Sequence, residues 1–261
     1  MKLGLIFAKR NFKEMIRDPL IYVFCVAFPM LMIILFAIIN HYTQGNTPVF
    51  ALRSLIPGIL VFAYTFVMLL MSLLVSKDRV SSLLKRLYAS PMKSHDFIIG
   101  YALPGIIIGI LQSVFCVLVG FFLHLITAES YFSFLSSLLL LLTEFPMLLF
   151  NVFTGILIGT LFNEKSAPGV TSILISISGL LGGCWMPLDT MGGFETFCRF
   201  LPFYPAVYLG RILTGATHTD GSFYTFDDIA KFGLIPIVVF FILAIGLSLI
   251  AFQKQKTNEK A

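Results

Sequence analysis

Long runs of apolar residues dominate the chain, and short polar stretches separate them. Six of these runs approach or exceed the roughly 20 residues that a helix needs to cross a hydrocarbon core of about 30 Å. They occupy residues 20–39, 55–75, 98–126, 134–161, 169–185 and 234–252. Because the runs are continuous and do not alternate with polar residues, they predict transmembrane helices.

Another apolar stretch lies between the fifth and sixth runs, but glycine and proline residues interrupt it. Gly192, Gly193, Pro202 and Pro205 break an aromatic-rich segment that continues to Leu213. We expect two short re-entrant helices here, with a bend at the two prolines. Broken backbone at membrane depth persists only beside protein or a water-filled cavity.

The residues before the first run predict a helix that lies along the membrane surface. Residues 1–18 place apolar side chains on one helical face and basic side chains on another. The apolar face holds Leu3, Phe7, Ala8, Phe12 and Met15. Such a helix suits the interface between lipid tails and anionic headgroups. A simple basic flank, which only fixes orientation, is the alternative.

The expected fold is therefore all-α and embedded in a membrane. It has six transmembrane helices, an amino-terminal interfacial helix and two short re-entrant outer helices between spans five and six. We expect residues 1–261 to form a single transmembrane domain.

The polar segment 76–91, between the second and third runs, also has a helical pattern. Its apolar residues recur at the spacing of one helical stripe, namely Val80, Leu83, Leu84, Leu87 and Tyr88. Asp78, Arg79 and Arg86 lie off the stripe, and Pro91 ends the helix. We expect a short amphipathic helix whose stripe lies either in lipid or in a groove of a cytoplasmic protein.

Composition and charge agree with a membrane protein and indicate its orientation. Hydrophobic residues make up 58% of the chain and charged residues only 12%, against about 25% in soluble domains. Fourteen of the 18 Lys and Arg residues fall in the amino-terminal segment, in the loops after the second and fourth runs, and in the carboxyl-terminal tail. The positive-inside rule therefore predicts that both termini are cytoplasmic. The sequence shows no basic segment with interleaved aromatic residues, so it gives no indication of nucleic-acid binding.

Few polar residues inside the predicted spans are candidates for a functional role. Glu144 is the acidic residue deepest in a span, and Asn151 follows two turns later. A carboxylate at this depth is costly, so it faces protein or water. Glu144 is either part of a candidate substrate path or a hydrogen-bonded group that packs two helices together.

The chain lacks the sequence motifs of an enzyme or a metal site. It has no Gly-x-x-x-x-Gly-Lys-Ser/Thr phosphate-binding loop and no His-Glu-x-x-His or Cys-x-x-Cys motif. We therefore expect no catalytic residue, metal or cofactor in this chain. Cys25 and Cys116 lie in spans, and Cys184 and Cys198 are expected to be free thiols, with a disulfide as the alternative.

Two regions resemble the ABC-2 family of ATP-binding-cassette transporter permeases. Asp78 and Arg79, followed by Leu84, Arg86, Leu87 and Pro91, resemble the family's loop after its second span. The residues around the end of the fifth run resemble the family's outer signature, namely Gly182, Gly183, Pro187, Met191, Pro202, Pro205 and Arg211. Two departures are Ser81 and Ser82 in place of a common Gly, and Gly192 after Met191 in place of Pro.

The resemblance implies a permease subunit of a bacterial exporter in the cytoplasmic membrane. A separate cytoplasmic ATPase subunit would bind ATP and Mg²⁺, and the segment 76–91 would be its coupling helix. A second permease, identical or homologous, would complete a dimer. The expected substrates are hydrophobic antibiotics, antimicrobial peptides or lipid-like molecules, with lipid-linked glycans as an alternative. A proton-coupled transporter using Glu144 and a non-transporting scaffold or sensor are the other hypotheses.

Overall fold

The computed structural model describes residues 2–43, 47–81, 92, 94–127 and 131–258. Apart from one isolated bridge between Thr217 and Phe223, the described residues form only helices, turns and loops. In chain order the helices are α1 (Lys2–Arg17), α2 (Pro19–Ile21), η1 (Tyr22–Ala27), α3 (Phe28–Tyr42), η2 (Pro48–Phe50), α4 (Leu52–Val80), α6 (Ser94–Thr127), α7 (Phe134–Leu161), α8 (Ala167–Leu181), η3 (Leu188–Thr190), α9 (Gly193–Cys198), α10 (Phe203–Thr214) and α11 (Asp228–Asn258).

The all-α membrane fold expected from the sequence is confirmed. In the described part of the chain, five helical segments are long and apolar enough to cross a membrane, and α8 is a shorter apolar helix of 15 residues. The five segments are Pro19–Tyr42, Leu52–Val80, His95–Thr127, Phe134–Leu161 and Ile229–Gln255. The fifth expected span, 169–185, ends its helix early because Gly182 and Gly183 follow Leu181. Gly183 has a φ of +62°, which a glycine adopts without strain.

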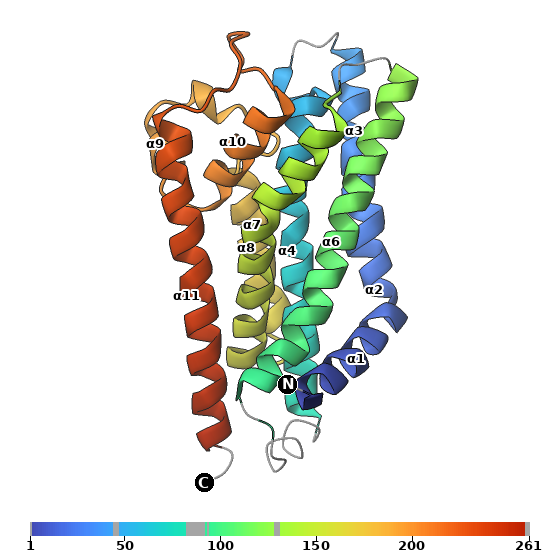
Figure 1. The fold of residues 1–261 in the computed structure, drawn as a ribbon, viewed down its shortest axis with the longest axis vertical. Coiled ribbons are helices and arrows are strands. Elements are labelled where there is room, and N and C mark those ends of the chain that lie inside the picture. Colours follow the sequence, from blue (N-terminus) through green and yellow to red (C-terminus); the bar gives the residue numbers. More distant parts are fainter. Residues whose placement is uncertain (1, 44–46, 82–91, 93, 128–130, 259–261) are drawn as a thin grey trace.

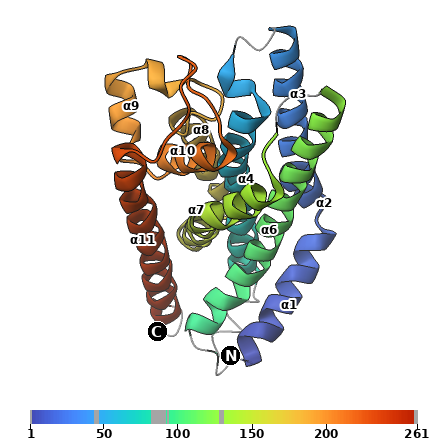
Figure 2. The ribbon, with the colours of Figure 1, turned by 45° about the horizontal axis from the view of Figure 1, so that its top comes forward.

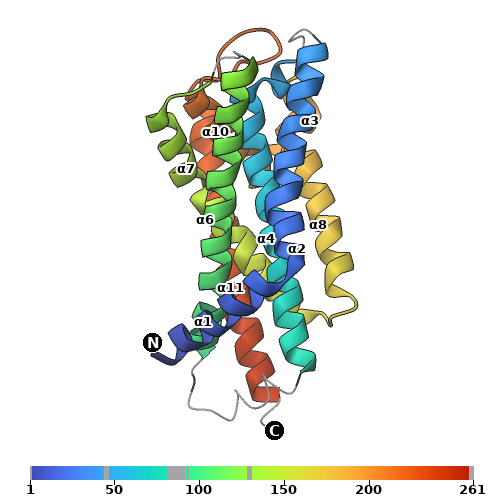
Figure 3. The same ribbon diagram turned by 90° about the vertical axis from the view of Figure 1, so that its right-hand side faces the viewer.

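The helices form an elongated bundle with the two ends of the described chain at the same end (Figure 1). We call this the terminal end and the opposite one the far end. α4 occupies the centre, and nearly all of its residues are buried. α11 stands at one edge of the bundle, and α3 and α6 lie on the other side (Figure 1). Figure 3 shows α8 and α6 on opposite sides of α4.

Close backbone contact holds α7 against α4. A Cβ atom built on Gly159 would lie 2.6 Å from the carbonyl oxygen of Ser72, which no real side chain tolerates. Gly155 meets Met68 in the same way, one turn earlier. Small residues at such positions let membrane helices approach closely.

The first span contains a wide turn that Pro29 explains. Proline has no amide hydrogen, and its ring crowds the carbonyl four residues earlier, on Cys25. Residues Tyr22–Ala27 accordingly form the π-helical turn η1, which ends with the amide of Phe28 bonded to the carbonyl of Val23, five residues back. The chain thereby passes the proline without leaving the helix.

The two short helices expected between the last two spans are present as α9 and α10. α10 begins at Phe203, after the N-cap Pro202, and lies across the far end of the bundle (Figure 2). All its residues from Phe203 to Arg211 are buried. The bend at Pro202 and Pro205 is therefore enclosed by protein, as membrane depth requires, whereas the break at Gly192 and Gly193 is exposed.

The amino-terminal helix is confirmed, but its apolar face packs on protein. Phe7 contacts Tyr101 of α6 edge-on, with ring centroids 4.9 Å apart, and Ala8 and Met15 are also buried. Leu3, which the sequence placed on the same face, is 44% exposed. Gly4, rather than Leu3, faces α6, beside Asp96.

Candidate functional site

A buried ionic cluster joins three helices at the terminal end. Asp78, in the last turn of α4, accepts two hydrogen bonds from the Arg10 guanidinium of α1, at 2.8 and 3.2 Å. The Tyr101 hydroxyl of α6 donates a third, at 2.9 Å. The Asp78 side chain is only 3% exposed. Pairing and hydrogen bonds offset the cost of burying a charged carboxylate, so this cluster ties α1 and α6 to the end of α4.

Further contacts fix Arg10 in the cluster. Burial tends to lower the pKa of its guanidinium, but the hydrogen bond and negative charge of Asp78 outweigh this effect and raise that pKa. The neighbouring Asn11 donates to the carbonyl of Gly100 on α6 at 3.0 Å. Glu14 accepts ion pairs from Arg10 and from Lys77, the latter at 3.3 Å. Side chains of α1 are thus bonded to both α4 and α6.

Arg79 connects the same end of α4 to α7. Its guanidinium donates to the carbonyls of Gly159 and Phe162, at 3.3 and 3.0 Å. These carbonyls lie where α7 ends and lack further helical donors, so the positive charge also suits the helix dipole. Two consecutive residues, Asp78 and Arg79, therefore link α4 to α1, α6 and α7.

The structure corrects the expected start of the coupling helix. The sequence predicted a separate helix from Ser76, with Asp78 and Arg79 as charges off its apolar stripe. Instead, residues 76–80 continue α4, and Asp78 is buried because Arg10 and Tyr101 offset its desolvation. Val80 is 68% exposed. The remaining predicted coupling residues, Leu83, Leu84, Arg86, Leu87 and Pro91, lie outside the described residues.

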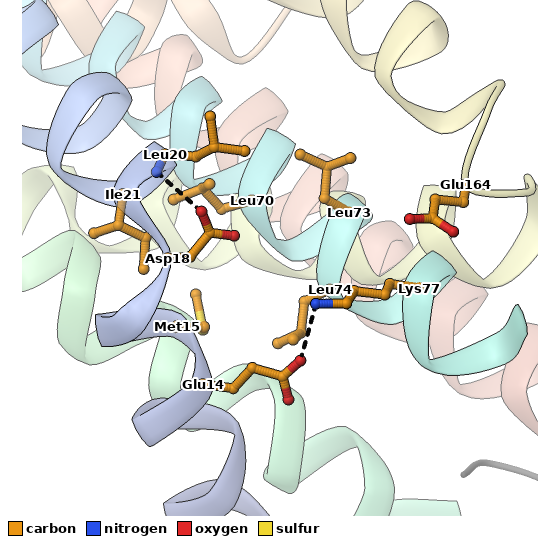
Figure 4. Close-up of a pocket in the computed structure, with 10 residues that line it drawn as sticks. All are labelled: Glu14, Met15, Asp18, Leu20, Ile21, Leu70, Leu73, Leu74, Lys77 and Glu164. Atoms are coloured by element: carbon orange, nitrogen blue, oxygen red, sulfur yellow. Dashed lines mark hydrogen bonds and ion pairs between the residues drawn. The ribbon is translucent and has the colours of Figure 1, made fainter. Parts of the chain in front are cut away.

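A cavity of about 230 Å³ adjoins this cluster (Figure 4). It lies between the α1–α2 junction and the terminal half of α4, and Leu70, Leu73 and Leu74 form its apolar wall. Carboxylates and one ammonium surround it, on Glu14, Asp18, Lys77 and Glu164. A wider charged groove of about 600 Å³ continues along α1 past Lys13 and Arg17. Apolar walls with a charged rim are typical of a protein-binding surface.

The two candidate path residues lie inside packed protein. Glu144 of α7 is fully buried, and neither of its carboxylate oxygens has a hydrogen-bond partner. Its Oε1 lies against α10, since a Cβ built on Gly210 would come 2.8 Å from it. Asn151 donates to the carbonyl of Met147 at 2.9 Å, while its own Oδ1 has no partner. Among the described residues both side chains are fully enclosed, so neither faces an open channel.

The outer signature residues meet at the far end around Arg211. This arginine is 1% exposed and donates to the carbonyl of Gly183 at 2.8 Å and to that of Ser54 at 3.4 Å. It also donates to the Tyr224 hydroxyl at 3.3 Å. Arg211 thus attaches α10 to the start of α4 and to the chain after α8.

The other signature residues shape the backbone around this attachment. Gly182 ends α8, Pro187 precedes η3, and Met191 follows it. Pro202 caps α10, and Pro205 packs so closely on Gly233 that a Cβ there would lie 2.7 Å away. Cys184 and Cys198 are buried free thiols, as expected.

Sequence reasoning missed Arg10, Asn11 and Tyr101. Arg10 looked like one more member of a basic flank, and Tyr101 looked like an aromatic residue near the start of a span. One signal was present in Asn11, which follows Phe7 at helical spacing on the buried face of α1. A polar side chain on such a face implies a hydrogen-bond partner.

The comparisons with known proteins point to one family. The model of the ABC-2 type transporter family matches residues 3–214, from the start of α1 to the last residue of α10. Comparison with curated proteins finds no match. The family match covers most of the 261 residues and includes both the ionic cluster and the Arg211 junction. The chain therefore belongs to the ABC-2 type transporter family and is a multi-pass membrane permease component of an ABC-type transporter, without an ATPase site of its own.

Proposed function

We propose that this permease works with a separate ABC ATPase that binds at the terminal end, on the cytoplasmic side. It exports a hydrophobic or amphipathic substrate, such as an antibiotic, an antimicrobial peptide or a lipid-like molecule, across the cytoplasmic membrane of a bacterium. The partner binds ATP and Mg²⁺, and its movement reaches the spans through the segment that follows α4.

The Asp78 cluster is the observation that carries this proposal. A force applied to the chain after Val80 acts directly on the end of α4. Because Asp78 and Arg79 bond to α1, α6 and α7, those helices move with it. A rigid hydrogen-bonded junction of this kind suits a part that transmits motion, since packed elements shift as units.

The cavity in Figure 4 supports docking at this end. Its leucine wall offers apolar area, and its charged rim offers ion pairs to a protein partner. The adjoining groove carries Arg10, Lys13, Arg17 and Lys77, which gives the surface a mainly basic edge. We expect the ATPase to contact this surface together with the segment 76–91.

A second permease copy, identical or homologous, would form the substrate path. Within the described residues, Glu144 and Asn151 are enclosed and α4 is buried along its length. Three cavities lie between α1 and α4, between α9 and α11, and between α1 and α6, not around Glu144 or Asn151. A continuous path therefore needs a surface that a second subunit shares.

Co-purification with the ATPase tests the proposal. We expect a tagged permease to retain an ABC ATPase, and amphipathic compounds to change the ATP hydrolysis rate of the complex. Replacing Leu84 and Leu87 together by Asp is expected to release the ATPase, because charge opposes burial of the predicted stripe. Thr225→Asp, at an exposed position at the far end, is the control and retains it.

Two results would contradict the proposal. An intact and active complex with the double aspartate variant would remove the predicted stripe from the interface. Transport that stops with an uncoupler, survives ATP depletion and is lost in Glu144→Gln would favour a proton-coupled transporter. The unpaired, buried carboxylate of Glu144 is the observation behind that second candidate.

A further inference from the structure

A groove of about 390 Å³ lies at the far end of the bundle, between α9 and the start of α11 (Figure 2). Most of its lining is apolar, with Phe200 just after α9 and Ile229, Phe232, Ile235 and Pro236 on α11. Phe200, Phe232 and Ile235 are 72%, 67% and 58% exposed. The groove therefore opens outward and is not part of the packed interior.

The position of the groove along α11 places it where acyl chains meet headgroups. Its α11 residues belong to the first turns of a candidate membrane span, Ile229–Gln255. That span stands at one edge of the bundle, and few of its residues are buried. Exposed apolar side chains at the end of a span lie against lipid tails, and the headgroups lie just beyond them.

Arg199, in the turn that ends α9, supplies a cation to this groove. Its Nη2 donates to Glu195 at 2.9 Å, and Glu195 also accepts a hydrogen bond from the Tyr204 hydroxyl at 2.9 Å. Glu195 therefore holds the guanidinium in place. A guanidinium has five N–H donors, and this pairing uses one of them.

The remaining donors of Arg199 are open to a ligand on one side. Among the described residues, neither its Nε nor its Nη1 has a hydrogen-bond partner. The Nε is buried, but the Nη1 is not among the buried unpaired atoms, and the side chain is 39% exposed. The Nη1 is thus the donor that a molecule in the groove reaches.

The charge of the lining selects the kind of headgroup. Of the described residues that line the groove, Arg199 alone is charged. Glu195 is not in the described lining, and its side chain is only 11% exposed. An ammonium group therefore gains no carboxylate there, whereas a phosphate gains a charge-assisted hydrogen bond from the guanidinium.

We propose that this groove binds an anionic phospholipid from the leaflet at the far end. One acyl chain lies along Phe232 and Ile235, and the phosphate accepts a hydrogen bond from the Nη1 of Arg199. A protein cavity of about 150 Å³ holds benzene, so about 390 Å³ holds a section of an acyl chain. This binding needs neither ATP nor an ATPase, so it goes beyond the proposed function and is tested on the permease alone.

Quenching of tryptophan fluorescence by brominated lipids tests the groove in nanodiscs. Trp185→Phe removes the protein's single tryptophan, and Phe232→Trp then places a reporter in the lining. Two bilayers contain equal amounts of phosphatidylglycerol and phosphatidylcholine, and they differ only in which lipid carries bromine on its acyl chains. We expect brominated phosphatidylglycerol to occupy the groove about twofold to fivefold more than phosphatidylcholine, the range of a partly exposed ion pair.

A reporter outside the groove provides the control. Phe122→Trp lies near the far end of α6, at a position that is 60% exposed and does not line the groove. We expect the two brominated lipids to quench this reporter equally. Preference for phosphatidylglycerol at position 232 alone would assign the selectivity to the groove.

Two changes test the role of the Arg199 charge. Arg199→Gln is expected to remove the preference at position 232, and Arg199→Lys to keep part of it. Salt at about 1 M, where the Debye length is about 3 Å, is expected to weaken the preference with Arg199 in place. The salt measurement decides the matter even if Arg199→Gln fails to fold.

Four results would overturn the proposal. Equal quenching by both lipids at position 232 would show that the groove has no selectivity. A preference that persists in Arg199→Gln or at high salt would remove Arg199 from the site. Quenching by neither lipid, with normal quenching at position 122, would mean that protein such as a second copy covers the groove. A stronger effect of sodium phosphate than of sodium chloride at equal ionic strength would indicate a site for free anions.

Discussion

At the residue scale, the two partners in the Arg10–Asp78 pair have unequal surroundings. The Asp78 side chain is 3% exposed, whereas that of Arg10 is 39% exposed. Loss of the arginine therefore leaves a buried carboxylate with only the Tyr101 hydroxyl as a partner. Loss of the carboxylate leaves a guanidinium that still reaches water. Removing either partner is harmful, but for different physical reasons.

This asymmetry predicts unequal effects of substitution. We expect Arg10→Met to lower the free energy of unfolding by about 3–5 kcal/mol, the cost of breaking a buried ion pair. Asp78→Asn keeps an acceptor for Tyr101 and is expected to cost about 1–2 kcal/mol. Thermal unfolding of the purified protein measures both, with Lys13→Met as the control at an exposed position of α1. Equal midpoints for Arg10→Met and Lys13→Met would contradict the cluster.

At the scale of elements, the contact between α4 and α7 depends on the absence of side-chain atoms. Gly155 and Gly159 bring the two backbones together along the terminal half of α7. Gly246 of α11 is different, because a Cβ built on it meets nothing within 4 Å. The same substitution at the two kinds of glycine should therefore have opposite effects.

Gly159→Ala is expected to destabilise the protein by about 1–3 kcal/mol, because the new methyl group forces the two helices apart. Gly246→Ala is expected to stabilise it by up to about 1 kcal/mol through the better helix propensity of alanine. Thermal unfolding in the same detergent compares the two variants. A stabilised Gly159→Ala protein would show that α4 and α7 do not pack as closely as described.

At the scale of the whole molecule, the distribution of basic residues predicts which end faces the cytoplasm. The terminal end carries the basic face of α1 together with Lys77, Arg79 and Lys165, while Arg53, Arg199, Arg211 and Lys231 belong to the far end. The positive-inside rule then predicts cytoplasmic termini. The far-end loop around Thr219, which is exposed, is predicted to face outward.

Cysteine labelling in intact cells tests this orientation. In a background without the four native cysteines, we expect Thr219→Cys to react with a membrane-impermeant maleimide. Lys13→Cys is expected to react only after the membrane is permeabilised. Both positions are exposed, so accessibility within the protein does not limit either reaction. Labelling of Lys13→Cys in intact cells would reverse the predicted topology.

The sequence by itself determined the membrane-embedded, all-helical fold, the approximate spans and the two short helices before the last span. Hydropathy suffices for this because each apolar helix satisfies its own backbone hydrogen bonds in lipid. The sequence also indicated the family, because the outer signature around Gly182 and Arg211 is a local sequence pattern. The motif could not show that these two regions are joined in space through Gly183 and Arg211.

Only the tertiary structure decided which polar residues act together. Arg10 and Asp78 are 68 positions apart, and their pairing depends on how α1 crosses α4 and α6. The extension of α4 past Ser76 brings Asp78 to Arg10 and Tyr101, whose hydrogen bonds offset the cost of burying its charge.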